Sequence, residues 1–316
     1  AKEYFKNLSK HRICFDDDAS RQDSLSLAFS KKRADNRKTW TAAYRDDTID
    51  HNATSITYSD FVHKELVLFS RADLVRSIPS AIDGLKPGQR KVVYAAFKRR
   101  LTNDIKVAQF AGYVAEHSAY HHGETSLANT IIGLAQTYVG SNNVNLFVPS
   151  GQFGTRIVGG NDAASPRYIY TRLEDITRHI FHADDDVLLD TLVEEGQRIE
   201  PRFYIPILPM ILVNGAAGIG TGWSTSIPSY NPDDIKRNII KALDGDPMVD
   251  MAPWYRGFKG SIVETSTGFE SHGCWRIDGR NIVITELPIG RWTHAAKDYF
   301  QSMLDKHTSG VRVRHV

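Results

Sequence analysis

Apolar side chains recur at helical spacing through the first half of the chain. After a candidate cap at Ser59 and Asp60, one apolar stripe predicts a helix that runs to about Ser70; it consists of Phe61, Leu66, Val67 and Phe69. A second stripe predicts the buried face of a helix that begins near Pro87; it consists of Val93, Tyr94, Phe97 and Leu101. A third, over residues 127–135, predicts another helix. These segments predict a helical domain.

Strand-like runs follow the helices. Residues 144–148 and 168–170 flank a glycine-rich loop, so two helices followed by these strands predict a helix-turn-helix with a wing. Prolines after residue 200 mark a domain boundary near 205. Beyond it we expect a helix at 233–243, strands at 260–265, 274–277 and 282–287, and a helix near 293–304. The predicted fold class is α+β and multidomain, with an α/β last domain.

Composition limits the class of protein. The 316 residues are 41% hydrophobic and 24% charged, which is typical of a globular protein with two or three domains. A net charge of only +2 means that any nucleic-acid affinity must come from local patches. Cys14 and Cys274 lie far apart and predict neither a disulfide framework nor a zinc site. No apolar run reaches the roughly 18 residues of a membrane span. Because residue 1 is not Met and residues 311–316 still alternate like a strand, we expect a piece of a larger protein.

Two acidic runs and a polar stretch read as connecting segments. Residues 16–18 and 184–186 are each three consecutive aspartates, whose side chains cannot all face one cation, so we favour solvated loops over metal sites. Residues 1–47 are charged and helix-prone, and residues 45–56 are polar and predict a linker. No metal ligands are predicted.

A basic segment is the first functional signal. Between residues 84 and 103 there is no acidic side chain, and the basic ones are Lys86, Arg90, Lys91, Lys98, Arg99 and Arg100. A helix with one apolar face, a basic remainder and an N-terminus that favours anions is typical of phosphate-backbone binding. The alternative is a solvated basic face.

Two further features have a functional and a structural interpretation. His121 and His122 directly precede a helix, so they lack the spacing of helical zinc ligands and better suit a phosphate contact or proton transfer. Ile219 stands between Gly218 and Gly220, as a wedge between base pairs would. On the loop alone, a tight turn with the isoleucine packed inward is favoured. A dinucleotide loop is excluded because Trp223 occupies the place of the third glycine.

The sharpest candidate is Tyr168, which follows Arg167 directly. A free tyrosine has a pKa of about 10 and is a poor nucleophile, but a neighbouring arginine can hold the phosphate that it attacks. Most tyrosines are structural, with the ring against a core and the hydroxyl at the surface. The pair alone therefore leaves both interpretations open.

Six blocks together resemble the breakage-reunion part of eukaryotic type IIA DNA topoisomerases: residues 28–32, 83–92, 120–124, 151–156, 162–170 and 214–224. They follow the family's order and spacing over almost the whole chain. The resemblance implies the C-terminal remnant of a TOPRIM domain at 1–45, a linker at 46–56, a winged-helix domain at 57–205 and a truncated tower domain at 206–316.

The resemblance also implies roles. Tyr168 corresponds to the catalytic tyrosine that forms a 5′-phosphotyrosyl link, with Arg167, Arg76 and His122 around the scissile phosphate. Lys86 and Arg90 correspond to DNA-backbone contacts and Ile219 to the isoleucine that bends DNA. Lys91 and His121 are further DNA-binding candidates from the basic helix and the histidine pair.

For the whole protein, the resemblance implies a nuclear homodimer acting on double-stranded DNA, with Mg²⁺ and ATP bound by domains outside this chain. The alternatives are a non-catalytic winged-helix DNA-binding module and a tyrosine recombinase, which would form a 3′-linked adduct.

Overall fold

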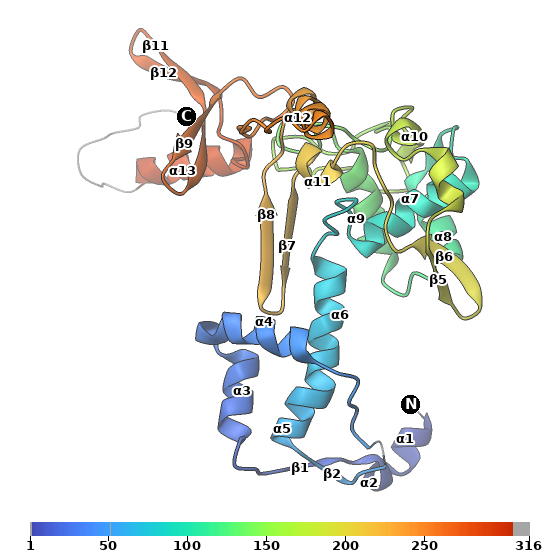
Figure 1. Ribbon diagram of the computed structural model, residues 1–316. Helices are drawn as coiled ribbons and strands as arrows, with labels where there is room; N and C mark the ends of the chain where they lie inside the picture. Colours follow the sequence, from blue (N-terminus) through green and yellow to red (C-terminus); the bar gives the residue numbers. More distant parts are fainter. Residues whose placement is uncertain (1, 51, 306–316) are drawn as a thin grey trace. The chain divides into compact units, whose positions relative to one another are not determined.

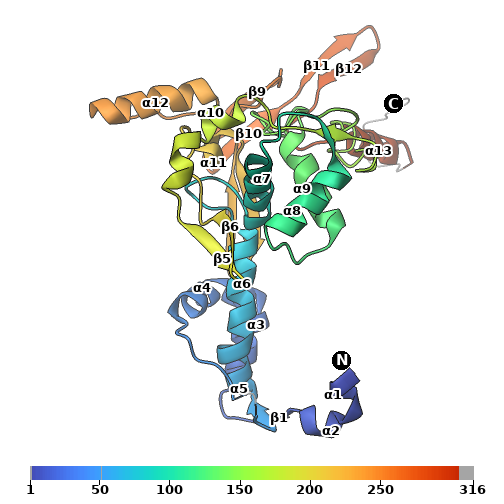
Figure 2. The same cartoon turned by 90° about the vertical axis from the view of Figure 1, so that its right-hand side faces the viewer.

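The computed structural model describes residues 2–50 and 52–305, and the run at 311–316 lies outside them (Figures 1 and 2). The chain divides into two compact units. Unit 1 comprises Ala1–Pro79 and Ala217–Ser226, and unit 2 comprises Ser80–Ala216 and Ile227–Val316. This grouping cuts across the predicted boundaries at 45, 56 and 205, which stay predictions.

Unit 1 is mainly helical. Its N-terminal part contains α1 (Lys2–Lys6), α2 (Leu8–His11), β1 (Cys14–Asp16), α3 (Arg21–Phe29), η1 (Lys31–Arg33) and α4 (Ala34–Ala43). The predicted linker ends in β2 (Ser55–Thr57), which pairs in parallel with β1. The next helix continues through α5 (Tyr58–Asp60), the π-helix η2 (Phe61–Leu66) and α6 (Val67–Ser77), beyond its predicted end.

The π-helical turn corrects the apolar stripe predicted for that helix. Val62 and Val67 are fully buried, but Phe69 is 61% exposed. A π turn holds more residues than an α turn, so it rotates the residues that follow it away from the face that an α period predicts. Phe69 is therefore turned away from the core.

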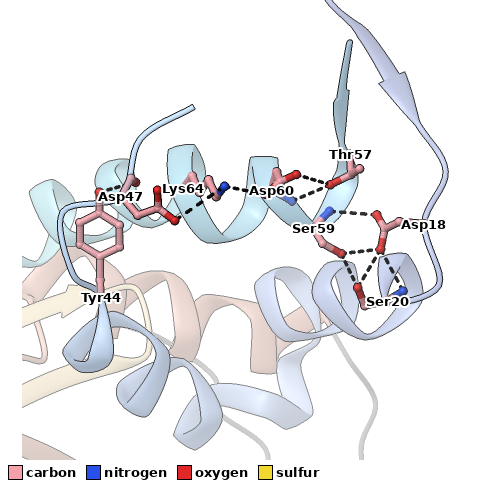
Figure 3. A network of polar contacts seen from close by, with 8 residues as sticks. All are labelled: Asp18, Ser20, Tyr44, Asp47, Thr57, Ser59, Asp60 and Lys64. Carbon is pink, nitrogen blue, oxygen red and sulfur yellow. Dashed lines mark hydrogen bonds and ion pairs between the residues drawn. The ribbon is translucent and has the colours of Figure 1, made fainter. Parts of the chain in front are cut away.

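The first aspartate run is a structural anchor rather than a solvated loop (Figure 3). Asp18 accepts hydrogen bonds from the Ser59 hydroxyl at 2.7 Å and the Ser20 hydroxyl at 2.8 Å, and from the backbone N–H of both serines. These bonds, the Ser59 hydroxyl first, lower the pKa of Asp18 to about 2. One carboxylate thus ties the start of α3 to α5.

Substituting Asn for Asp18 should weaken unit 1 in a pH-dependent way. The folded pKa lies below the ordinary value, so the stabilisation is complete above about pH 4 and disappears as the pH falls through about 2. The difference in denaturation midpoint between wild type and Asp18→Asn should therefore be constant near neutral pH and shrink toward pH 2. Asp46→Asn, at an exposed position of the same unit, controls for the loss of one charge. A difference that does not change with pH would contradict the anchor.

The core of unit 2 lies between three helices, which Figures 1 and 2 show grouped together: α7 (Pro87–Arg99), α8 (Val107–His117) and α9 (Glu124–Ala135). The predicted helices are confirmed, and Val93, Phe110, Leu127 and Ile131 are fully buried between them. Their apolar side chains recur at the helical period, so burial fixes both their length and their face.

A small sheet follows the three helices. The strand β4 (Tyr170–Thr171) pairs antiparallel with β3 (Ile105–Lys106), and isolated bridges join Phe147 to Leu173 and Ser150 to Tyr170. The predicted segments do pair, with a register displaced toward higher numbers on both strands. The winged-helix assignment itself stays a proposal.

The rest of unit 2 is built from short elements. They are α10 (Thr177–Ile180), the 3-10 helix η3 (Ala183–Val187), the hairpin β5 (Thr191–Glu194) and β6 (Gln197–Pro201), α11 (Met210–Val213), α12 (Pro232–Asp244), the hairpins β9 (Ser261–Thr265)–β10 (Gly268–His272) and β11 (Cys274–Asp278)–β12 (Asn281–Glu286), and α13 (Thr293–Asp305). The second aspartate run forms a helical turn rather than a loop. The strands β5, β6 and β10 were not predicted, because their sequences do not alternate apolar and polar residues. Both cysteines are free, and within the described residues no helix has the length and hydropathy to span a membrane.

Candidate functional site

Tyr168 projects into solvent from a turn with a fixed backbone. The Tyr168 N–H donates to the Ser165 carbonyl at 2.9 Å. On either side, the N–H groups of Val107 and Ala108, in the first turn of α8, donate to the Ile169 and Pro166 carbonyls, each at 3.0 Å. Ile169 is 1% exposed and Tyr168 is 74% exposed, because neighbouring residues of an extended segment point in opposite directions. The buried isoleucine therefore directs the phenol outward.

The glycine-rich loop supports this turn. Gly151 has a φ of +115°, and a Cβ there would lie 2.9 Å from Cγ2 of Ile169. Gly154 has a φ of +97°, and a Cβ there would lie 2.5 Å from the Gly160 carbonyl oxygen. Both positions need glycine for conformation and for space. The loop is therefore closed on itself and has a packing role.

A carboxylate locks the same loop. Asp162 accepts hydrogen bonds from the Thr155 hydroxyl at 2.6 Å and the Thr155 N–H at 2.7 Å, which lower the pKa of Asp162. Arg156 pairs with Glu286 and donates to the Leu287 carbonyl at 2.6 Å. The loop before Tyr168 is thus tied at its middle and its end.

Tyr168 differs from the other tyrosines by exposure and neighbours. Burial raises the pKa of Tyr138 and of Tyr204, so both hold their protons more tightly than a free tyrosine. Tyr4 and Tyr299 are also exposed, but no arginine adjoins either. Exposure together with an adjacent arginine therefore favours the functional interpretation of Tyr168.

The other predicted catalytic residues are exposed but divided between the units. Arg167 is exposed, and no carboxylate in the described part of the chain lies within salt-bridge distance of it. His122 is exposed beside the ring of Tyr120, at a centroid distance of 5.4 Å. Arg76 belongs to unit 1 and pairs with Asp73 at 2.9 Å. Its place beside Tyr168 stays a prediction.

Arg90 corrects the predicted DNA-binding surface. It is 5% exposed, and its guanidinium forms two hydrogen bonds to the fully buried Asp83, at 2.7 and 3.0 Å. A third bond joins it to the Leu85 carbonyl at 2.9 Å. The guanidinium is thus not available to a DNA backbone in this conformation, and Arg90 has a structural role.

Lys91 and His121 have protein partners too. Lys91 pairs with Glu200 at 2.9 Å, and its side chain is 14% exposed, so the prediction of a DNA contact through it is wrong for this conformation. His121 Nε2 lies 2.8 Å from Glu194 Oε1, although the His121 ring is mostly exposed. Lys86 is half-buried where α7 begins. Of these four candidates, Lys86 and His121 keep surface that a phosphate could reach.

Ile219 answers the question that the sequence left open. It is 83% exposed on β7 (Ala216–Gly220), which forms a hairpin with β8 (Trp223–Ile227). A Cβ at Gly218 would lie 2.3 Å from the Ser77 carbonyl oxygen, and a Cβ at Gly220 would lie 2.8 Å from Cδ2 of Leu74. Both glycines let the hairpin lie against α6, as Figure 1 shows. The inward-packed alternative is therefore wrong.

A Mg²⁺ site does not fit the described residues. They contain no group of three or more histidine, cysteine, aspartate or glutamate side chains that could hold a metal ion. Asp18, the best-organised carboxylate of the first aspartate run, is used in hydrogen bonds to two serines. No step of the chemistry is therefore assigned to a metal held by these residues.

Comparison with known proteins gives a consistent result. Residues 76–314 match the DNA gyrase/topoisomerase IV family model, which describes the A-type chain of those enzymes, and residues 1–74 match the model of the C-terminal associated domain of TOPRIM. The chain is 52% identical to a probable DNA topoisomerase 2 and 51% identical to a mitochondrial DNA topoisomerase 2, both of Dictyostelium discoideum. These alignments cover 98% and 97% of the chain but only 21% and 24% of the relatives.

A solved structure is similar along almost the whole chain. The crystal structure of the Plasmodium falciparum topoisomerase II DNA-binding, cleavage and re-ligation domain superposes with a TM-score of 0.83 at 50% identity. The match covers 97% of this chain and 43% of that one. The chain thus spans about a fifth of the length of the curated relatives and under half of the solved one.

Proposed function

The chain belongs to the type IIA DNA topoisomerase family, and we propose that it carries the DNA-cleaving tyrosine of a type II DNA topoisomerase. The observation that carries the proposal is Tyr168, which is 74% exposed beside Arg167 on a turn fixed by α8. A nucleophile that must attack a DNA phosphate needs both access and a rigid base.

In the proposed reaction, Tyr168 Oη attacks a backbone phosphorus. The new O–P bond replaces the bond to the 3′ oxygen, which leaves as a hydroxyl after it takes up a proton. Arg167 and Arg76 stabilise the charge that develops on the phosphate oxygens, and His122 donates a hydrogen bond or a proton there. One phosphodiester is exchanged for another, so the 3′ hydroxyl can reseal the break without an external energy source.

The whole protein has wider properties that we propose from its family. They are cleavage of both strands by a homodimer, passage of a second duplex, use of Mg²⁺ and ATP, and a nuclear location. A mitochondrial relative of similar identity means that location does not follow from family alone. We assign Mg²⁺ and ATP to parts of the protein other than the described residues, which do not fit a metal site. We also propose the winged-helix domain at 57–205 and the tower domain at 206–316.

Ile219 is proposed as the DNA-bending wedge, so Ile219→Ala should reduce the bend of bound DNA. Inserted apolar side chains kink DNA by about 20–90°, and we expect a decrease of about 20° or more, measured by FRET between the duplex ends. Stability should change by less than about 0.5 kcal/mol, because the side chain is 83% exposed. Leu243→Ala is the matched control, since Leu243 is 82% exposed on α12. An unchanged bend in Ile219→Ala would exclude the wedge.

The test of the proposed function is which DNA end becomes linked to the full-length protein. End-labelled duplex should give adducts on 5′ ends, with free 3′ hydroxyls. A 3′-linked adduct would indicate a recombinase-like tyrosine. Tight DNA binding with no adduct, in the presence of Mg²⁺, would favour a non-catalytic DNA-binding module.

A further inference from the structure

The loop that joins α8 to α9 carries His122 in a backbone conformation that needs support. Ala119 has a φ of +48°, in the left-handed region that residues other than glycine seldom adopt. Ser118, just before it, is fully buried, and its hydroxyl donates to the Val114 carbonyl at 2.6 Å. A strained residue persists only where its surroundings hold it. The contacts around Ser118 therefore decide where His122 lies.

Lys91 provides the main contact. Its ammonium donates to the Ser118 carbonyl and to Oε2 of Glu200, at 2.9 Å for the second bond. Glu200 lies on β6 and is 2% exposed, and the Lys91 side chain is 14% exposed. A buried ammonium that is bonded to a carboxylate and a carbonyl has little freedom. It connects β6, α7 and the end of α8 at one point.

The same hairpin meets the loop a second time. Glu194, the last residue of β5, accepts or shares a proton with His121 Nε2 at 2.8 Å. The Tyr94 hydroxyl also donates to the Arg198 carbonyl at 3.3 Å, which joins α7 to β6. The hairpin β5–β6 thus reaches both ends of the segment from Ser118 to His121.

We propose that the hairpin β5–β6 positions the His122 loop, with Lys91 and Glu200 as positioning residues and Glu194 as a weaker second tether. The inference rests on the proposed function, since His122 must act at the scissile phosphate for its position to matter. It gives the buried Lys91–Glu200 pair a purpose beyond stability.

The test is the single-turnover rate of adduct formation by the full-length protein at saturating DNA. Lys91→Met frees the Ser118 carbonyl, and a displacement of about 1 Å near a reacting group can lower the rate on the order of 10²-fold. We expect a loss of about 10- to 100-fold with unchanged DNA affinity. Lys236→Met, at an exposed position on α12, is the matched control and should keep the wild-type rate.

A compensated variant separates position from stability. Lys91→Met leaves Glu200 buried and unpaired and will destabilise the fold, whereas Lys91→Met/Glu200→Gln removes that charge and should recover much of the Tm. The double variant should stay slow, because the Ser118 carbonyl is still not held. Its return to the wild-type rate would overturn the proposal. Hydrogen exchange at residues 118–123 should be faster in both variants, and unchanged exchange would also contradict it.

A third variant avoids the buried pair. Glu194 is partly exposed, so Glu194→Gln should fold normally and slow adduct formation by about two- to fivefold, as expected for the loss of an exposed ion pair. An unchanged rate would remove the second tether. If the wild-type protein forms no adduct at all, the proposed function fails. If the wild type reacts and the double variant reacts equally fast, only the positioning role fails.

Discussion

Tyr168→Phe is expected to abolish covalent DNA–protein adducts while DNA binding and the fold are retained. The substitution removes only the hydroxyl, and the turn is held by backbone bonds from Val107 and Ala108 that do not involve the phenol. Removing the nucleophile of a covalent mechanism lowers the rate on the order of 10⁴- to 10⁶-fold. Adducts trapped with denaturant in the full-length protein should therefore fall below detection, with an unchanged Kd for DNA.

Tyr170→Phe is the matched control for the loss of a hydroxyl. Tyr170 lies two residues further on in β4 and is 38% exposed. It should form adducts at close to the wild-type rate, because its backbone bonds to Ser150 are preserved. Normal adducts in Tyr168→Phe, or their loss only in Tyr170→Phe, would place the nucleophile elsewhere.

Asp83→Ala is expected to destabilise unit 2 by about 3–5 kcal/mol, the usual cost of removing one partner from a buried ion pair. Asp83 is fully buried and bonded to Arg90 at 2.7 and 3.0 Å, to the Leu85 N–H at 2.9 Å and to the Tyr204 N–H at 3.0 Å. The alanine variant leaves a buried guanidinium and two N–H groups without their acceptor. Urea denaturation followed by circular dichroism measures the loss.

Two comparisons make that result specific. Asp190 and Arg202 form a pair at 3.0 Å on the surface, with side chains 80% and 64% exposed, so Asp190→Ala should cost less than about 1 kcal/mol. The double variant Asp83→Leu/Arg90→Met should recover much of the loss, since no buried charge remains. A cost below about 1 kcal/mol for Asp83→Ala would mean that Arg90 is solvated and free to meet DNA after all.

Segments with a strong period could be predicted from sequence, and segments whose structure depends on distant partners could not. The helices α7, α8 and α9 were predicted because their apolar residues recur every third or fourth position and pack into one core. The stripe before them failed at Phe69, since a π turn changes the period without a signal in composition. The hairpin β5–β6 was missed because half of its residues are charged or polar and its pairing is exposed.

The site shows the same limit. Arg90 and Lys91 look like surface cations in a run that has no acidic residue, but their partners Asp83 and Glu200 lie outside that run. An aspartate seven residues before an arginine is a signal for Arg90 that sequence reasoning could have used. Glu200 lies 109 positions from Lys91, and only the fold brings the two together. The exposure of Ile219 likewise depends on how its glycines meet α6.

The most direct test of the central claim is to identify the residue that carries DNA after cleavage. Trypsin should release residues 168–172 from the trapped full-length protein, because Arg167 and Arg172 are cleavage points. Fragmentation of that peptide by mass spectrometry distinguishes Tyr168 from Tyr170. We expect a nucleotide attached to Tyr168 through its 5′ phosphate. A nucleotide on any other residue, or one attached through its 3′ phosphate, would contradict the account.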